Sequence, residues 1–195
     1  MKFGPSSSAN PHGRDPQADR RRLLRALPAL AAVLAWVSPP ARANPRTIGW
    51  ELLVPPGWDP MKDLKEPGLS ILSDADPRAQ QMMSRLRELW DKAPVNNAIV
   101  GQNVRLPGFV VPLEETRDGV KEFLLVPYFG ACIHSPPPPA NQIIHVLPRT
   151  PAKGFRSMDT VWVSGVLQAI RTDSYMGVSG YRMQADAVAP YSEKK

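Results

Sequence analysis

The stretch Val161-Trp162-Val163-Ser164-Gly165-Val166-Leu167 decides the fold. Its apolar and β-branched residues predict a strand, and Gly165 lies in the middle of that strand. A glycine inside a strand often marks a bend or a bulge, because it has no side chain to pack on the pleated surface. A sheet that curves back on itself needs such a bend. The stretch therefore predicts a small closed or half-closed barrel.

Four neighbouring segments also predict strands, because β-branched residues are frequent in them and apolar residues alternate with polar ones. Asp118-Gly119 is typical of a tight turn between two of these strands. The pattern predicts a mainly β fold. An OB-like barrel of about five strands is the first choice, and an α+β arrangement is the alternative. The strands, all within a β body of residues 99–190, are Gln102–Val111, Lys121–Val126, Gln142–Leu147, Thr160–Ile170 and Tyr181–Val188.

One α-helix is expected over residues 76–92, ahead of the strands. Asp76 is a good N-cap, Pro77 suits the first helical position, and Pro94 follows the helix. Apolar residues recur at steps of three and four and form one stripe, which we expect to pack on the core. Methionines in such a stripe are more typical of core packing than of copper binding. The stripe consists of Met82, Met83, Leu86, Leu89 and Trp90.

Residues 1–43 are typical of a cleaved export leader. Basic residues come first, an apolar run from Leu23 to Val37 follows, and Ala41-Arg42-Ala43 offers the small residues that a signal peptidase accepts. The run is shorter than the ~20 apolar residues that a membrane-spanning helix needs. Arg20-Arg21-Arg22-Leu23-Leu24-Arg25 resembles a twin-arginine box, so both export routes stay open. Residues 44–195 are expected to form one soluble domain, periplasmic or secreted.

The segment between the leader and the helix, residues 44–74, is rich in proline and glycine. It also contains two tryptophans and a run of aliphatic residues, which makes it too apolar for a solvated linker. We therefore expect an arm or a short strand packed on the barrel. The apolar residues are Trp50, Leu52, Leu53, Val54 and Trp58.

The charge of the chain belongs mainly to the leader. The whole chain has 24 basic and 18 acidic residues, a net charge of +6. Residues 1–43 hold 7 of the basic and 2 of the acidic residues, which leaves 17 and 16 in the rest. A domain so close to neutrality lacks the electrostatic footprint of a nucleic-acid-binding protein. We therefore expect no nucleic-acid partner and, after the leader, no transmembrane segment.

The residues with metal or thiol chemistry lie in the loop after the second predicted strand. Cys132 is the only cysteine, so it cannot form an internal disulfide, and His134 follows two positions later. Residues two apart in an extended segment point to the same side, and four prolines at 136–139 stiffen the segment. A thiolate and an imidazole are good ligands for zinc or copper. The pair therefore predicts a transition-metal site.

His145 is the other histidine after the leader and a weaker third ligand, with Glu122, Asp159 or water as the fourth. Against this, His145 alternates with Ile143 and Leu147, so it can instead face the core. A purely structural role also stays open, because a lone buried cysteine often behaves as a small hydrophobe.

The same residues also allow a thiol enzyme. An imidazolium beside a thiol stabilises the thiolate, and Asn141 could orient His134. However, two-residue spacing in an extended segment places the side chains in parallel, and no oxyanion hole is evident. The chain also contains no Walker loop, dinucleotide fingerprint or HExxH motif. A non-catalytic protein is therefore expected more than an enzyme.

The central loop resembles a known family. Residues Pro127–His134, the prolines at 136–139 and Asn141-Gln142 are similar to the motif of a bacterial envelope family, domain of unknown function 3299 (DUF3299). The resemblance covers nearly all of residues 48–190. It implies a compact secreted or periplasmic domain without an established reaction, with envelope ABC-transporter components as expected partners. Similar flanking segments are Trp50–Pro55, Arg105–Leu113, Val161–Gly165 and Gly180–Met183.

Three functions follow from these observations. The first is a periplasmic accessory protein that binds zinc or copper through Cys132, His134 and His145. The second is a non-enzymatic interaction module of an envelope ABC-transport or assembly complex. The third is a thiol-dependent enzyme that uses Cys132 and His134, with Asn141 as a third residue.

Overall fold

The computed structural model describes residues 1, 4, 44–59, 76–132 and 137–192. Residue contacts group Ala43–Lys195 into one compact unit, apart from Met1–Arg42. The predicted leader lies outside the described residues except at positions 1 and 4, and so do the second half of the arm and His134.

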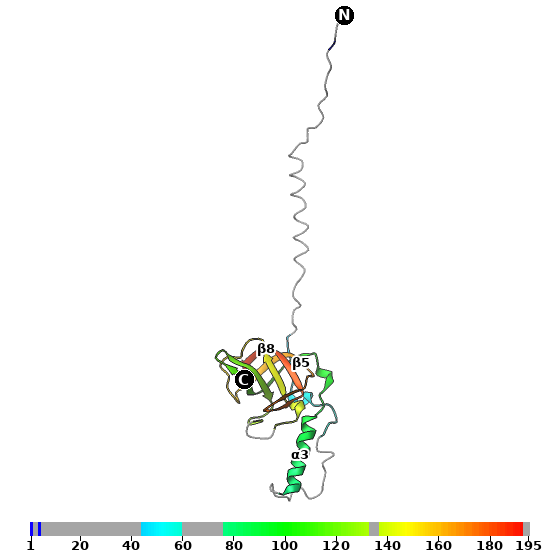
Figure 1. Ribbon diagram of the computed structural model, residues 1–195, viewed down its shortest axis with the longest axis vertical. Helices are drawn as coiled ribbons and strands as arrows, with labels where there is room; N and C mark the ends of the chain where they lie inside the picture. Colours follow the sequence, from blue (N-terminus) through cyan, green and yellow to red (C-terminus); the bar gives the residue numbers. More distant parts are fainter. Residues whose placement is uncertain (2–3, 5–43, 60–75, 133–136, 193–195) are drawn as a thin grey trace. The chain divides into compact units, whose positions relative to one another are not determined.

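Five strands form a closed barrel (Figure 1). Around the barrel they are β2 (Asn103–Thr116), β3 (Gly119–Val126), β4 (Ile144–Pro148), β8 (Tyr181–Pro190) and β5 (Thr160–Gln168). The barrel closes because β5 also pairs with β2. β4 and β8 are parallel and the other four pairs are antiparallel, which is the arrangement of an OB-type barrel. The predicted small barrel with one helix is confirmed.

Short elements complete the described chain. β1 adds to β2 in parallel, and β6 and β7 form a hairpin between β5 and β8. The sequence did not predict this hairpin, because three-residue strands are too short to show an alternation. These elements are β1 (Arg46–Thr47), β6 (Thr172–Ser174), β7 (Gly177–Ser179) and the 3-10 turns η2 (Trp50–Leu53), η4 (Asn97–Ile99) and η5 (Ala140–Gln142).

The backbones of β5 and β8 are in close contact beside Gly165. Their register shifts there, since Ser164 lies opposite Ala187 and Gly165 lies opposite Ala185. A Cβ atom on Gly165 would lie 2.4 Å from the carbonyl oxygen of Gln184. No side chain fits at this distance, so the glycine permits the bulge that the sequence led us to expect.

The barrel interior is filled by buried aliphatic residues from all five strands, together with Phe123 and Tyr181. The Tyr181 hydroxyl accepts a hydrogen bond from the Asn96 amide (2.6 Å) and donates one to the Leu53 carbonyl (2.7 Å). Leu53 is completely buried. The described part of the arm is thus packed on the same core.

Helix α3 (Pro77–Asp91) begins as predicted, with the Asp76 carboxylate accepting a hydrogen bond from the Arg78 amide. Its apolar stripe does not pack on the core, so that expectation was wrong. None of its residues is buried, and Met83 and Leu89 are 48% and 37% exposed. The helix projects from the barrel (Figure 1), because strand residues already fill the interior.

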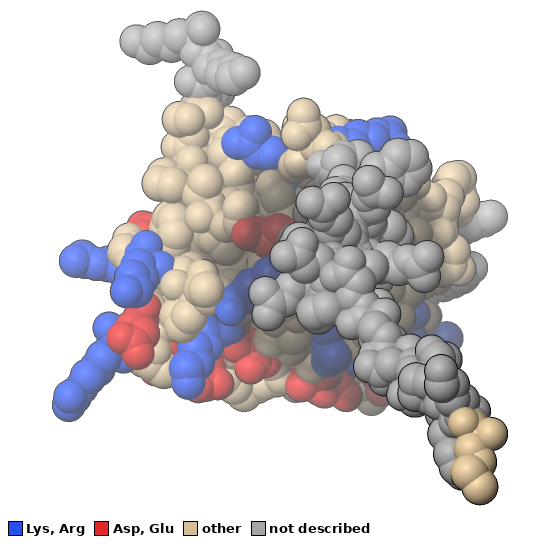
Figure 2. All heavy atoms as spheres, turned by 90° about the horizontal axis from the view of Figure 1, so that it is seen from above, with Lys and Arg blue, Asp and Glu red and all other residues tan. Residues whose placement is uncertain are grey.

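The surface has no strong charge of one sign on the face shown in Figure 2, where acidic and basic side chains are interspersed. This agrees with the near-neutral composition of residues 44–195. None of the helices that the structure describes is long and apolar enough to cross a membrane.

Replacement of Gly165 by alanine is expected to lower the free energy of unfolding by about 2 kcal/mol, the usual cost of forcing atoms into a packed site. The added methyl group would collide with the Gln184 carbonyl oxygen, which the strand pairing holds in place. Urea unfolding of the purified protein measures the change. Ser164→Ala is the control, because Ser164 is only partly buried beside the same bulge. Equal stability of the two variants would refute this account of barrel closure.

Candidate functional site

The outer face of β3 and β4 is covered by loops from three parts of the chain. In OB-type barrels this face and the adjoining loops bind the ligand. Here the β6–β7 hairpin lies across it: the Tyr175 hydroxyl donates to the Pro112 carbonyl (3.3 Å), and Arg182 donates to the Thr172 hydroxyl (3.0 Å). The hairpin is thereby tied to β2 at one end and to β8 at the other.

A second apolar cluster, separate from the barrel interior, lies on this outer face. Its buried members are Val111, Leu124, Val126, Ala131 and Ile143. Five partly buried residues pack against them, and three of these contain sulfur. The five are Phe109, Leu113, Cys132, Met158 and Met176.

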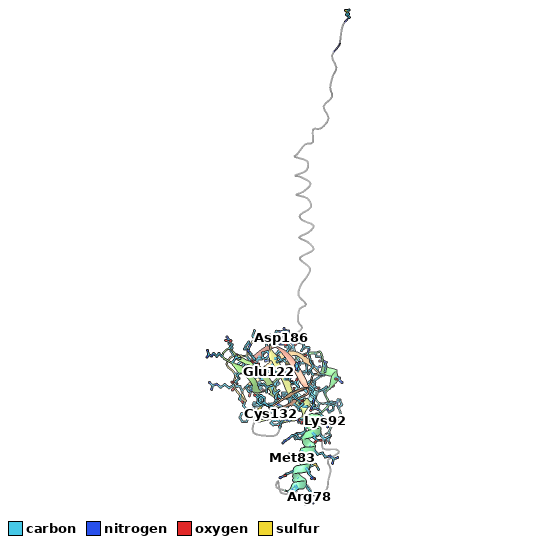
Figure 3. All side chains as sticks on the ribbon, viewed as in Figure 1. Arg78, Met83, Lys92, Glu122, Cys132 and Asp186 are labelled. Atoms are coloured by element: carbon cyan, nitrogen blue, oxygen red, sulfur yellow. The ribbon has the colours of Figure 1, made fainter. Side chains whose placement is uncertain are left out.

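Cys132 is a half-buried free thiol in this cluster, and Figure 3 places it at the lower edge of the barrel. Burial raises the pKa of the Cys132 thiol to about 11. The pKa of the Tyr128 hydroxyl is also raised, first by its own burial and then by charge on Cys132, which places the two side chains close together. At neutral pH the thiol is therefore protonated and is a poor nucleophile.

Met158 is held beside the same loop at two points. Its amide donates to the Val110 carbonyl (2.7 Å), and its sulfur accepts a hydrogen bond from the Gly130 amide (3.1 Å). Met176 lies in the turn of the β6–β7 hairpin, where its amide donates to the Ser174 hydroxyl. Sequence reasoning missed both methionines, since isolated loop methionines form no pattern.

His145 forms a different group on the same outer face. Ile144 and Val146 occupy the interior of the barrel, so His145, which alternates with them, points to the outer face and not into the barrel core. β4 begins at Ile144, two residues later than predicted. His145 is nevertheless only 4% exposed. Its Nε2 atom lies 2.5 Å from Glu122 Oε1, and its buried Nδ1 atom has no partner among the described residues.

The structure brings together Glu122 and His145, two of the predicted metal ligands, but places them apart from Cys132. Leu124 packs in the sulfur-containing cluster and is the register partner of His145 on the neighbouring strand. In the parts of the chain that the structure describes, no three His, Cys, Asp or Glu side chains lie close enough to share a metal ion. His134 lies outside those parts.

The remaining predicted residues have local partners. The Asp159 carboxylate accepts a hydrogen bond from the Arg156 amide (2.8 Å). Asn141 is completely buried, and its side-chain amide donates to the Pro94 carbonyl (2.9 Å). This bond ties η5 to the segment that follows α3, which is a structural role.

A groove of 740 Å³ lies elsewhere on the barrel, between residues 148–155 and the second half of β8. Arg149 and Asp186 form an ion pair at its wall, with a distance of 2.6 Å between Nε and Oδ1. None of the predicted site residues lines it.

Comparison with known proteins places the chain in a family. The model of the family described as "Protein of unknown function (DUF3299)" matches residues 50–190. A solved DUF3299 family protein from Pseudomonas aeruginosa PAO1 is 37% identical, with a TM-score of 0.61, over 78% of this chain and 100% of that one.

A putative aspartyl-tRNA synthetase from Leishmania major Friedlin is 10% identical, with a TM-score of 0.30 over 50% of this chain and 20% of that one. That likeness is too low to support an argument about fold or function. No curated protein matches the chain. The family match over residues 50–190 and the 37% identity lead to one conclusion: the chain belongs to the DUF3299 family.

Proposed function

We propose that this protein is an exported, non-enzymatic accessory protein that binds a transition metal, zinc or copper, at the Cys132 loop, with Cys132 and His134 as ligands. The observation that supports it is the packing of one thiol and two thioethers against the same small cluster. Protein metal sites need several donors from separate segments, and thiol and thioether sulfurs are donors for soft ions. The leader-like sequence of residues 1–43 supports export.

The position of His145 argues for a revised ligand set. Its Nε2 atom lies within hydrogen-bond distance of Glu122, and its ring is covered. To bind a metal together with Cys132, the imidazole would have to leave Glu122, and no three described His, Cys, Asp or Glu side chains lie close enough to share an ion. We therefore propose that Cys132 and His134 bind the ion and that His145 stays paired with Glu122.

The protonated thiol disfavours the thiol-enzyme alternative. A catalytic cysteine needs an adjacent base or a lowered pKa, whereas burial raises the pKa of Cys132. The His145 imidazole pairs with Glu122, and Asn141 donates to a backbone carbonyl. None of these described groups activates the thiol.

A second candidate function is the interaction module of an envelope ABC-transport or assembly complex. The exposed apolar stripe of α3, with Met83 and Leu89, favours it. This function does not need Cys132. Leu89→Ser would therefore weaken such a complex and leave metal binding unchanged.

Metal binding is tested by elemental analysis of the chain purified from its own host without a histidine tag. We expect near-stoichiometric zinc or copper in the wild type and its loss in Cys132→Ser, which changes one atom of the side chain. His145→Gln is the matched control and should keep the metal, because His145 pairs with Glu122. A metal content that is independent of Cys132, or no metal after titration under reducing conditions, would overturn the proposal.

The reactivity of Cys132 distinguishes the proposed metal-binding protein, a metal carrier, from the thiol-enzyme alternative. A pKa of about 11, against an ordinary 9.0, leaves the metal-free thiol with roughly a hundredth of the usual thiolate at neutral pH. We expect alkylation by iodoacetamide to be slow at pH 7 and to accelerate up to about pH 11. Mass spectrometry of timed samples gives the rate, with the urea-unfolded chain as reference. Faster labelling of the folded chain than of the unfolded chain would restore the enzyme hypothesis.

A further inference from the structure

The strand register explains why three sulfur-bearing side chains pack against one apolar cluster. Phe109 on β2 lies opposite Val126 on one side and opposite Thr160 on the other. The loop that follows Val126 leads to Cys132, and the loop that ends at Thr160 contains Met158. The barrel therefore brings these two loops together although they are far apart in sequence. The Gly130–Met158 hydrogen bond shows that they touch.

The third sulfur arrives with the β6–β7 hairpin. A Cβ atom on Gly177, next to Met176, would lie 3.1 Å from Pro137 Cβ and 3.7 Å from Ile143 Cδ1. The turn of the hairpin is thus in contact with the end of the Cys132 loop and with the buried cluster. The hydrogen bond from Tyr175 to Pro112 fixes the turn in that position. Cys132, Met158 and Met176 are all residues of intermediate exposure, so none of them is sealed in the barrel core.

Packing alone does not account for the place of Met158. Methionine often fills irregular gaps in an apolar core. In this cluster, however, the Met158 sulfur is oriented by a polar contact with the Gly130 amide, two residues before Cys132. That bond uses one lone pair of the sulfur and leaves another for an ion. Three loops, held by the hydrogen bonds of Gly130, Met158 and Tyr175, thus place three sulfur donors against the same small cluster.

The donors and their surroundings select the ion. Thioethers are soft ligands that suit monovalent copper, whereas zinc takes thiolate, imidazole and carboxylate. Charge points the same way. A thiolate and one monovalent copper ion sum to zero, whereas zinc would leave a positive charge against five buried apolar residues.

We propose that Cys132, Met158 and Met176 bind one monovalent copper ion on the outer face of β3. The proposal rests on the proposed metal-binding function and names its ion and two further ligands. On binding, a copper–sulfur bond replaces the thiol S–H bond, and the proton leaves to the buffer. No oxidant or reductant is consumed, because the copper arrives and stays in the monovalent state.

The test is an anaerobic titration of the whole chain with monovalent copper against a competing chromogenic chelator. Met158→Leu and Met176→Leu are nearly isosteric, so they remove the sulfur and keep the packing. Each should weaken copper binding by at least about tenfold, because loss of even an outer partner of a metal ligand usually lowers metal affinity by that much. Met83→Leu, the same change on the exposed side of α3, is the control and should bind as the wild type does. Copper X-ray absorption should show sulfur scattering that falls in the double variant.

The outcomes separate the two proposals. Copper binding that needs Cys132 but not the two methionines would overturn the three-sulfur site and leave the proposed function standing. Stoichiometric zinc, with no binding of monovalent copper in the competition, would also overturn the three-sulfur copper site and leave the proposed function standing. No binding of either metal would overturn both proposals. Thermal unfolding of each variant within a few degrees of the wild type excludes misfolding as the cause.

Discussion

The close approach of β5 and β8 at Gly165 is the constraint on which the rest of the structure depends. It lets β5 pair with β8 on one side and with β2 on the other, so the sheet closes. Barrel closure buries Phe123, Leu125 and Tyr181 in one interior core. It leaves the apolar side chains of Leu124 and Val126 on the outer face, where loops outside the barrel must bury them. The loops that supply this cover are the ones that contain Cys132, Met158 and Met176. The candidate site is therefore a consequence of barrel closure.

An OB-type barrel that covers its own ligand-binding face is limited in what it can bind. The β6–β7 hairpin crosses the outer face from Arg182 to Pro112, and His145 is buried on that face with its Glu122 partner. A nucleic acid or an oligosaccharide needs this face open. The partly exposed surface that remains is where the covering loops bring Cys132, Met158 and Met176 to the same cluster. Partly buried sulfur-bearing side chains suit a small ion better than an extended polymer.

The sequence predicted the positions of strands and of the helix, which depend on local patterns. It did not predict which faces are buried or which side chains become neighbours, because tertiary packing determines these. Alternation located all five barrel strands, and Asp76-Pro77 located the start of α3. The apolar stripe of α3 did not reach the core, because periodicity shows that a helix has an apolar face but not what covers it. His145 faces outward because Ile144 and Val146 occupy the barrel interior, and alternation alone does not tell which of a strand's two faces turns inward. Met158 and Met176 reach the same cluster as Cys132 only through strand pairing, so the sequence could suggest the cysteine but not the two methionines.

The raised pKa of Cys132 fits a carrier better than a catalyst. A catalyst needs its thiolate before the substrate arrives, and an apolar cluster makes that state costly. A carrier needs the thiolate only while the ion is present, when the charge of the ion compensates it. On the proposed export route the empty protein also meets an oxidising compartment, where an exposed thiolate would be oxidised. Under the proposed function, the burial that makes Cys132 a poor nucleophile also protects this thiol, the only one of the chain, from oxidation before the metal replaces its proton.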